Sequence, residues 1–419
     1  MTLKTAAQKN RASKAGAKKP NDARSPRTLS GTLSGTNLER AGDYNLRTVL
    51  QAIRLQPDVT RIEISQLTGL TAPTIANITH RLIEMGLVTV VGRRKGVRGH
   101  PALMLRVVPE GAFSIGLNID RDHLTILILD LEGVVRSRVS REAAFAMPEE
   151  VIAFVRDELD GVITSGKVDR TRILGVGVAI PDDLGRISLA HRPPGYERWS
   201  DIAIDKALAD LMPWPIHCDN DAAAAALGEA EYGTAFDNPS FFYLLISAGL
   251  GGGLVINRNY HRGAASRSGE IGLMPDPTST GPNMLVQDTV SMSALLERLE
   301  QAGLASPSIT DLAAPCPETE AVIRRWLEDS VRSLTLPLVS LSCLIDPHAI
   351  LIGGRLPESL IARLAAGLTE ALSRMALPST PRIMPAVIAQ DAPAIGAAIL
   401  PFLDQLLPSD AILMQAGRN

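Results

Sequence analysis

The chain has 419 residues, of which 45% are hydrophobic and 21% are charged. These values are ordinary for a folded protein of several domains and exclude a mostly disordered chain. No run of about 18 uncharged apolar residues occurs, so we expect no membrane-spanning helix. The basic N-terminus has no apolar stretch behind it, and we therefore expect no signal peptide. Three widely separated cysteines, Cys218, Cys316 and Cys343, favour neither disulfides nor a Cys-x-x-Cys metal site, and predict a cytoplasmic protein.

Charge is unevenly distributed along the chain. The first 100 residues hold 17 Lys and Arg against 6 Asp and Glu, whereas the remainder holds 25 against 39. A basic first quarter on an acidic body favours a polyanionic partner for the N-terminus. The alternative is a basic tail that only keeps the protein in solution. Residues 1–40 are poor in apolar side chains, and we expect this basic tail to be disordered.

Residues 41–108 carry the signals of a helix-turn-helix unit. Apolar spacing predicts a helix over Asn45–Leu55. Thr60, with a glutamate three residues later, forms a capping box that begins a second helix at Arg61. Gly69 ends this helix in a left-handed turn, and Thr71 is expected to cap a third. Two helices joined by a tight glycine turn are typical of a helix-turn-helix, whose second helix enters the DNA major groove.

The third helix and the hairpin after it supply the predicted DNA contacts. On the helix, the polar side chains that face away from the apolar stripe are Thr71, Thr74, Asn77 and Arg81. They would meet base edges, and Asn77 suits adenine. Apolar stretches at Leu87–Val91 and Leu103–Val108 bracket a basic loop, which predicts a wing. The wing cations expected to contact phosphates or the minor groove are Arg93, Arg94 and Arg98. The alternative is a helical hairpin used only for dimerisation, with a solvated basic loop.

After about residue 109, strand-like and helical stretches alternate, which indicates an α/β body. The predicted strands are Ser114–Ile119, Leu124–Leu131, Ile173–Ile180, Phe242–Ile246, Leu254–Ile256 and Ile350–Ile352. The predicted helices are Val151–Ile163, Ala222–Ala230, Met292–Gln301, Glu318–Ile345 and Pro357–Met375.

The motif from Thr60 to Thr71, with Met85-Gly86-Leu87-Val88 and Gly99-His100-Pro101 behind it, resembles the ROK family (repressors, open reading frames, kinases). It is most similar to the transcriptional-repressor branch, which includes the xylose and N-acetylglucosamine repressors. The resemblance implies an α/β fold in which an N-terminal winged helix-turn-helix precedes two actin-like, RNase-H-like α/β lobes around a sugar cleft. It also implies a homodimer or homotetramer. We expect the winged helix-turn-helix at 41–108, lobe 1 at 109–235 with a C-terminal helix at about 391–406, and lobe 2 at 236–390.

The two phosphate-binding loops of ROK kinases are altered in this sequence. Asn118-Ile119-Asp120-Arg121-Asp122 stands where the kinases have Asp-x-Gly-Gly-Thr, so acids and a bulky cation replace the residues that approach phosphates. In the second loop, Ser247–Gly253, Ala248 replaces a threonine, and a glycine-rich hairpin explains this stretch equally well. Because Asn118, Asp120, Arg121 and Ala248 depart from the kinase pattern, we expect no ATP cofactor and no kinase activity.

The sugar-binding motifs are better preserved. Asn220 and Asp221 match the pair that bonds sugar hydroxyls, although the local pattern alone favours Asp221 as the cap of the helix that follows. Glu270 matches a carboxylate that accepts from two hydroxyls, and its alternative is a surface glutamate in a turn. Gln287 replaces a further sugar-binding glutamate. We expect these residues to form the effector site.

The zinc site of the family is absent from the sequence. The residues that stand at the four ligand positions are Leu273, Thr278, Thr280 and Leu285. None of these side chains is a zinc ligand, so we expect no bound metal.

These features predict a DNA-binding transcriptional regulator, a repressor, controlled by a sugar or sugar-derivative effector through a catalytically silent ROK body. Its expected partners are a double-stranded DNA operator, the effector and further copies of the chain. One alternative is a carbohydrate kinase with an added DNA-binding module. Another is a constitutive DNA-binding protein without a ligand.

Overall fold

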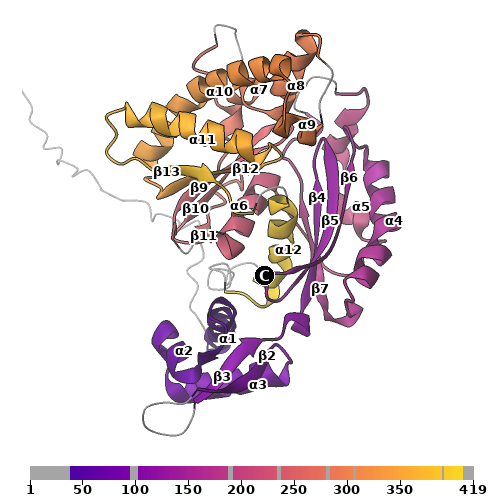
Figure 1. Cartoon of the computed structure of the whole chain (residues 1–419). Helices are drawn as coiled ribbons and strands as arrows, with labels where there is room; N and C mark the ends of the chain where they lie inside the picture. The colour runs from indigo at the N-terminus through magenta and orange to yellow at the C-terminus, as the bar shows by residue number, and fades with distance from the viewer. Residues whose placement is uncertain are drawn as a thin grey trace, which may run out of the picture.

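The computed structural model describes residues 38–94, 102–186, 192–233, 237–279, 284–304, 308–388 and 391–408. The described chain forms one small sheet with three helices, followed by two five-stranded sheets with their own helices (Figure 1). No helix in these ranges is long and apolar enough to cross a membrane. Nearly all of the predicted basic tail lies outside the described residues.

The N-terminal unit is the winged helix-turn-helix that the sequence predicts. Its elements are α1 (Leu38–Leu55), β1 (Val59–Thr60), α2 (Arg61–Thr68), α3 (Ala72–Glu84), β2 (Val88–Arg94) and β3 (Ala102–Val107). The capping box at Thr60 is formed, and Gly69 ends α2 with a left-handed φ of 70°. The strands pair in the order β1-β3-β2, so the antiparallel β2–β3 hairpin is the wing.

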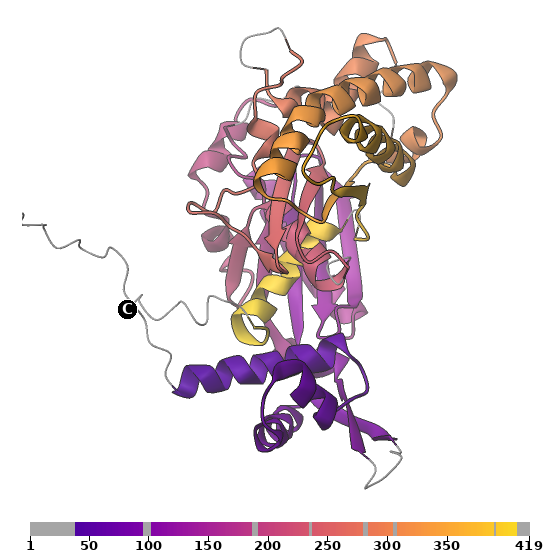
Figure 2. The same ribbon diagram turned by 90° about the vertical axis from the view of Figure 1, so that its left-hand side faces the viewer.

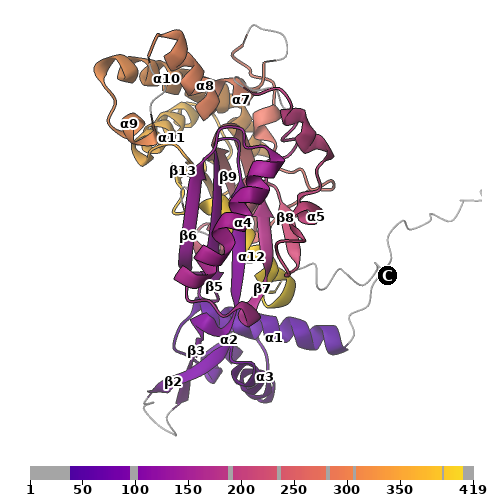
Figure 3. The ribbon, with the colours of Figure 1, turned by 90° about the vertical axis from the view of Figure 1, so that its right-hand side faces the viewer.

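The first large sheet has the order β6-β5-β4-β7-β8. Its strands are β4 (Phe113–Ile119), β5 (His123–Asp130), β6 (Val135–Glu142), β7 (Ile173–Ala179) and β8 (Ile216–Asp219). Helix α4 (Pro148–Ser165) packs on β5 and β6, with the short α5 (Ile204–Leu208) near β8 (Figure 3). The strand β4 runs antiparallel to β5 and parallel to β7, which places the β4–β5 turn beside the end of β7.

The second large sheet has the order β11-β10-β9-β12-β13. Its strands are β9 (Phe241–Ile246), β10 (Leu250–Ile256), β11 (Asn259–Tyr260), β12 (Ala349–Gly354) and β13 (Arg382–Pro385). The helices above it are α7 (Val286–Thr289), α8 (Met292–Gln301), α9 (Ile309–Ala313), α10 (Pro317–Leu344) and α11 (Glu358–Ser373) (Figure 1). Their apolar faces share one core with the sheet, centred on Trp326 and Leu364.

Two helices lie between the large sheets, α6 (Asp221–Tyr232) and α12 (Ala392–Gln405) (Figure 1). Helix α12 packs on β4 and β7, while α6 packs on β9 and β10. A β-carbon on Gly396 of α12 would lie 1.6 Å from the carbonyl oxygen of Ala224, so only glycine permits this helix contact. Helix α6 is therefore held closely on both sides.

Helix α1 fixes the winged helix-turn-helix to this central pair of helices. Figure 2 shows α1 passing below the end of α12. Arg47 donates to the carbonyl oxygens of Leu403 at 3.3 Å and of Asp404 at 2.7 Å. Apolar residues of α1, among them Leu50 and Ile53, belong to the same buried cluster as Phe402 of α12. The DNA-binding unit thus shares a hydrophobic core with the body.

Candidate functional site

The recognition helix α3 presents the polar face that the sequence predicts. Thr71, Asn77 and Arg81 are exposed and Thr74 is partly exposed, whereas Ile75 on the inner side is fully buried. Thr71 occupies the N-cap position, but its hydroxyl bonds the Thr74 hydroxyl at 2.9 Å instead of capping a backbone amide. The Thr71 side chain is consequently oriented by its neighbour and remains on the outer surface.

The wing arginines differ in their surroundings. Arg93 is exposed, and no partner for its guanidinium occurs within the described ranges. Arg94 instead donates to Glu63 Oε1 at 2.6 Å and to the Asp58 carbonyl oxygen at 3.0 Å, which ties the wing to the start of α2. Arg98 lies outside the described residues. Of the two wing arginines that the structure describes, Arg93 is the one whose guanidinium is free of protein contacts, and its contact with a phosphate stays a prediction.

The start of α6 holds the first two residues of the predicted effector site. Asn220 is the N-cap: its Oδ1 accepts from the amides of Ala222 at 2.9 Å and Ala223 at 3.1 Å. Its Nδ2 donates to Asp182 Oδ2 at 3.2 Å. The alternative expectation that Asp221 caps this helix is wrong, because Asn220 has that role and Asp221 is the first helical residue.

Asp221 is a buried carboxyl in an acidic environment. Burial raises its pKa to about 7, the charges of Asp120 and Asp182 add to the rise, and Arg121 opposes it. Its Oδ1 accepts one hydrogen bond, from the Ala222 amide at 2.8 Å. Most of its hydrogen-bonding capacity is thus available for a ligand hydroxyl.

Glu270 and Gln287 come from the chain around the second large sheet, Glu270 after β11 and Gln287 from α7. Glu270 is partly buried and accepts from Arg267 Nη2 at 3.1 Å. Burial raises the pKa of its carboxyl, with Asp182 adding to the rise and Arg267 opposing it. Gln287, in α7, is buried. It lies close to the β9–β10 turn, as a β-carbon on Gly249 would be 3.7 Å from its Oε1.

Three arginine–aspartate pairs of the described chain join the two large-sheet units near these residues. In each pair the arginine comes from the chain around the second large sheet and the aspartate from the first. The pairs are Arg262–Asp219 at 2.7 Å, Arg267–Asp183 at 2.7 Å and Arg355–Asp122 at 3.0 Å. The arrangement of the two sides is therefore fixed partly by charge pairs that border the predicted effector residues.

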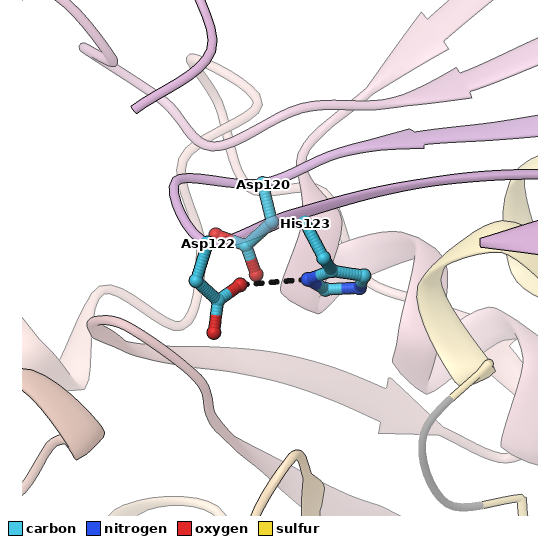
Figure 4. Close-up of side chains that lie close together, drawn as sticks. All are labelled: Asp120, Asp122 and His123. Carbon is cyan, nitrogen blue, oxygen red and sulfur yellow. Dashed lines mark hydrogen bonds and ion pairs between the residues drawn. The ribbon is translucent and has the colours of Figure 1, made fainter. Parts of the chain in front are cut away.

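The β4–β5 turn, where the sequence predicts an altered phosphate-binding loop, brings Asp120, Asp122 and His123 together, with His123 bonded to Asp122 (Figure 4). His123 Nδ1 bonds Asp122 Oδ1 at 2.7 Å, and its Nε2 lies 3.1 Å from Asn118 Nδ2. The Asp122 hydrogen bond and the charges of Asp120 and Asp122 raise the pKa of His123, outweighing the opposing effect of burial, which is the largest single influence. Protonation of His123 is thus easier than in a free histidine side chain.

The same turn places three groups of metal-binding type together. Ligand atoms of Asp120, Asp122 and His123 lie within 4.8 Å of one another. However, both ring nitrogens of His123 are engaged, and Arg355 lies against Asp122. A cation would have to displace these contacts, so our prediction for this turn remains that it binds no metal.

The Arg121 side chain reaches from the β4–β5 turn to the β9–β10 turn, the two turns where the sequence predicts altered phosphate-binding loops. Its guanidinium reaches the second loop, because a β-carbon on Gly249 would lie 3.2 Å from Arg121 Nη1. The side chain therefore fills space between the β4–β5 and β9–β10 turns. The sequence identified Arg121 only as a replacement for glycine, since nothing in the local pattern indicates how far a long side chain reaches.

The segment that the sequence analysis aligns with the family's zinc site is held by hydrogen bonds to one buried acid, Asp276. Asp276 Oδ1 accepts from the Thr278 amide at 2.9 Å and hydroxyl at 2.7 Å, and Oδ2 accepts from the Thr289 hydroxyl at 2.6 Å. Leu273 and Leu285 are partly buried nearby, while Thr280 lies outside the described residues. Asp276 thus supplies cross-links that the sequence analysis missed, because a lone aspartate between prolines carries no distinctive pattern.

Comparisons with known proteins agree with this arrangement. The sequence matches the ROK family over residues 114–402 and a winged helix-turn-helix DNA-binding family over residues 43–89. An uncharacterized protein of Sinorhizobium fredii is 27% identical over 365 residues, which are 85% of this chain and 90% of that protein. The xylose repressor of Bacillus subtilis is 24% identical over 374 residues, 86% of this chain and 96% of the repressor. A solved ROK family transcriptional regulator, a homologue of Escherichia coli Mlc, shares the fold with a TM-score of 0.67 at 22% identity, over 90% of this chain and 99% of its own.

Proposed function

The chain belongs to the ROK family, and we propose that it is a transcriptional repressor whose affinity for DNA is controlled by a sugar or sugar derivative. One observation carries this proposal: an exposed polar recognition helix belongs to one continuous fold with a polar cluster in which Asp221 and Glu270 are linked through Asn220, Asp182, Asp183 and Arg267. The repressor relatives support the same assignment.

We propose that the body has no kinase activity. A kinase must place backbone amides, cations or a metal against the transferred phosphoryl group. Here Asp120 is buried in the first loop, and Arg121 occupies the space against Gly249 in the second. Asp221, which would be the base in a kinase, is then left to bind a hydroxyl.

Helix α6 offers a direct route from the cleft to the DNA-binding unit. Asp221 begins the helix, and Glu231 and Tyr232 end it, about 17 Å away at 1.5 Å per residue. Glu231 accepts hydrogen bonds from Arg54 and Gln51 of α1, and the Arg54 guanidinium lies 4.9 Å from the centre of the Tyr232 ring. A change in the position of α6 would therefore alter these contacts with α1 directly.

Control of this kind requires two states of the protein, and the charge pairs near Glu270 are the contacts that would differ between them. A ligand shifts a conformational equilibrium only by binding one state better than the other. A sugar whose hydroxyls occupy Glu270 competes with Arg267, which also holds Asp183. Effector binding would thereby alter the contact between the two sides of the cleft and move α6, which packs on both α12 and β10.

We further propose that the repressor acts as a homodimer or homotetramer. Helix-turn-helix proteins read two half-sites about one helical turn apart, which requires two recognition helices related by symmetry. A change in the relative orientation of the paired α1 helices would then alter the half-site spacing that the protein fits.

The assignment is tested by DNA binding and by ADP release together. The intact protein should bind the DNA upstream of its own gene with a salt-dependent affinity, and should release no ADP from ATP with a panel of hexoses and pentoses. Failure to bind this DNA at low salt would refute the repressor assignment. Sugar-dependent ADP release would instead favour the carbohydrate kinase.

A further inference from the structure

The β4–β5 turn carries a largely buried cation, Arg121, whose guanidinium has no hydrogen-bond partner among the described residues. Arg121 is 6% exposed, and its Nε is buried without a partner. Within the described part of the chain, no side chain or carbonyl accepts a hydrogen bond from its guanidinium. The charges of Asp120 and Asp221 act on the guanidinium, but neither carboxylate accepts a hydrogen bond from it, and a buried N–H without an acceptor is rare. The Arg121 guanidinium can therefore take a hydrogen-bond acceptor from outside the described chain.

The surroundings of Arg121 place it inside the predicted effector site. A β-carbon on Gly249 would lie 3.2 Å from Arg121 Nη1 and 3.7 Å from Gln287 Oε1, so both side chains converge on this turn. The charge of Arg121 also acts on the buried carboxyls of Asp120 and Asp221. The guanidinium and the sugar-binding residues thus face the same space.

A second buried donor close to Arg121 is also unpaired. Tyr196 is 1% exposed, and its hydroxyl has no hydrogen-bond partner in the described structure. The Tyr196 ring packs edge-on against the Phe145 ring, with ring centroids 5.2 Å apart, and the Phe145 amide donates to the Arg121 carbonyl oxygen, so Tyr196 lies beside the β4–β5 turn. The charges of Arg121 and Asp120 also act on its hydroxyl. A guanidinium and a phenol are both hydrogen-bond donors, and together they suit an oxyanion.

We propose that the effector is an anionic sugar derivative, whose carboxylate or phosphate binds Arg121 and Tyr196 at the Gly249 turn while its hydroxyls bind Asp221 and Glu270. This inference rests on the proposed function, because it takes the cleft to be the effector site. It adds the chemical class of the effector and identifies Arg121 as the residue that determines specificity.

The acids around the subsite impose a pH dependence on such binding. Charged groups face this subsite from both large-sheet units. They are Arg121, Asp120, Asp122 and His123 from the β4–β5 turn and the start of β5, Asp182 after β7, Asp221 from α6, and Glu270 with Arg267 from the segment after β11. An anion favours the protonated form of Asp221, whose pKa burial raises to about 7. Binding of the anion is then accompanied by proton uptake, and the affinity falls as the pH rises from 6 to 8. A cationic amino sugar would instead be repelled by Arg121 and would leave it unpaired.

Matched ligands test the proposal on the full-length protein. Pentose, hexose and N-acetylhexosamine sets, each with neutral, carboxylate, phosphate and amino members, are compared by thermal shift and calorimetric titration. One set should show an anionic member that binds about 10- to 100-fold more tightly than its neutral counterpart, the range expected for a charge-assisted pair. The carboxylate and phosphate members distinguish a sugar acid from a sugar phosphate.

Variants of Arg121 separate this inference from the proposed function. Arg121→Gln should remove the preference for the anionic member and Arg121→Lys should retain part of it. Arg374→Gln, which breaks an exposed pair with Glu370 on α11, should leave it unchanged. If Arg121→Gln does not fold, loss of preference in Tyr196→Phe provides the same test.

The contradicting results are distinct. Equal binding of neutral and anionic members, unaffected by Arg121→Gln, overturns the anionic subsite and leaves the sugar-controlled repressor standing. Tighter binding of an amino sugar overturns it as well. If no member of any set binds, the inference falls together with the effector assignment.

Discussion

Removal of the Glu231 carboxylate should uncouple the effector site from the DNA-binding unit. The Arg54 side chain is 3% exposed and Glu231 is 15% exposed, so their ion pair is largely shielded from water. Breaking a buried pair by deleting one partner costs about 3–5 kcal/mol. Because the Tyr232 ring remains beside Arg54 and Glu231 is not fully buried, we expect Glu231→Ala to cost about 3 kcal/mol. Allosteric coupling free energies are about 1–3 kcal/mol, so a loss of this size is sufficient to abolish coupling.

The assay is operator binding by fluorescence anisotropy, with and without saturating effector. In the wild type the ratio of the two dissociation constants should be about 5–150, which corresponds to that coupling energy. In Glu231→Ala the ratio should approach 1, while calorimetric affinity for the effector stays near the wild-type value. Glu320→Ala, which breaks an exposed pair with Arg363, is the matched control and should retain the full ratio.

A wild-type ratio in Glu231→Ala, measured in a sample whose free energy of unfolding has fallen, would refute the role of α6. A double variant, Arg54→Met with Glu231→Gln, addresses misfolding, because it removes the charge without leaving a buried cation. It should be more stable than Glu231→Ala and equally uncoupled.

Three further predictions concern other parts of the molecule. Asn77→Ala should relax base preference at one operator position by about 1–3 kcal/mol, whereas Arg93→Ala should weaken binding to all sequences and lower the salt dependence; equal effects on all sequences from both variants would contradict this. Asp276→Ala should lower the free energy of unfolding by about 1–3 kcal/mol, and chelators should not affect the wild type; one metal ion per chain by elemental analysis would show the opposite. Because the folded protein raises the pKa of His123, the stabilisation it gives is complete below the unfolded pKa of about 6.5 and is lost as the pH rises through the higher folded value. The unfolding temperature should therefore fall less between pH 6 and 9 in His123→Gln than in the wild type, and parallel curves would exclude this role.

Local signals in the sequence predicted the DNA-binding unit closely. The capping box at Thr60 and the left-handed turn at Gly69 depend on residues within a few positions of each other, so the pattern alone determines them. The buried strands were also predicted, because short continuous apolar runs such as Ile350–Ile352 are typical of strands that are covered on both faces. Strand β6 was missed, since its alternating arginine and serine side chains resemble a solvated loop until β5 pairs with it.

The candidate site was predicted only in part, because its geometry depends on contacts between distant segments. Motif positions proposed Asp221 and Glu270 as effector ligands, which stays a prediction, but they did not indicate that Asn220 caps the helix. The partners Arg267 and Asp183 are 84 positions apart in the sequence, and no local pattern links them. The reach of Arg121 across the cleft likewise follows only from the packing of two turns.

The central claim, that a sugar bound in the cleft controls DNA binding, is tested most directly by titrating the operator complex with effector. A thermal-shift screen identifies the sugar derivative that stabilises the protein, and operator affinity is then measured across its concentration range for the wild type, Asp221→Ala and Glu270→Ala. The ligand should weaken operator binding by the wild type, and both variants should bind the operator normally but need much higher ligand concentrations for release. Operator affinity that does not change at ligand concentrations that saturate the stabilised protein would contradict this claim.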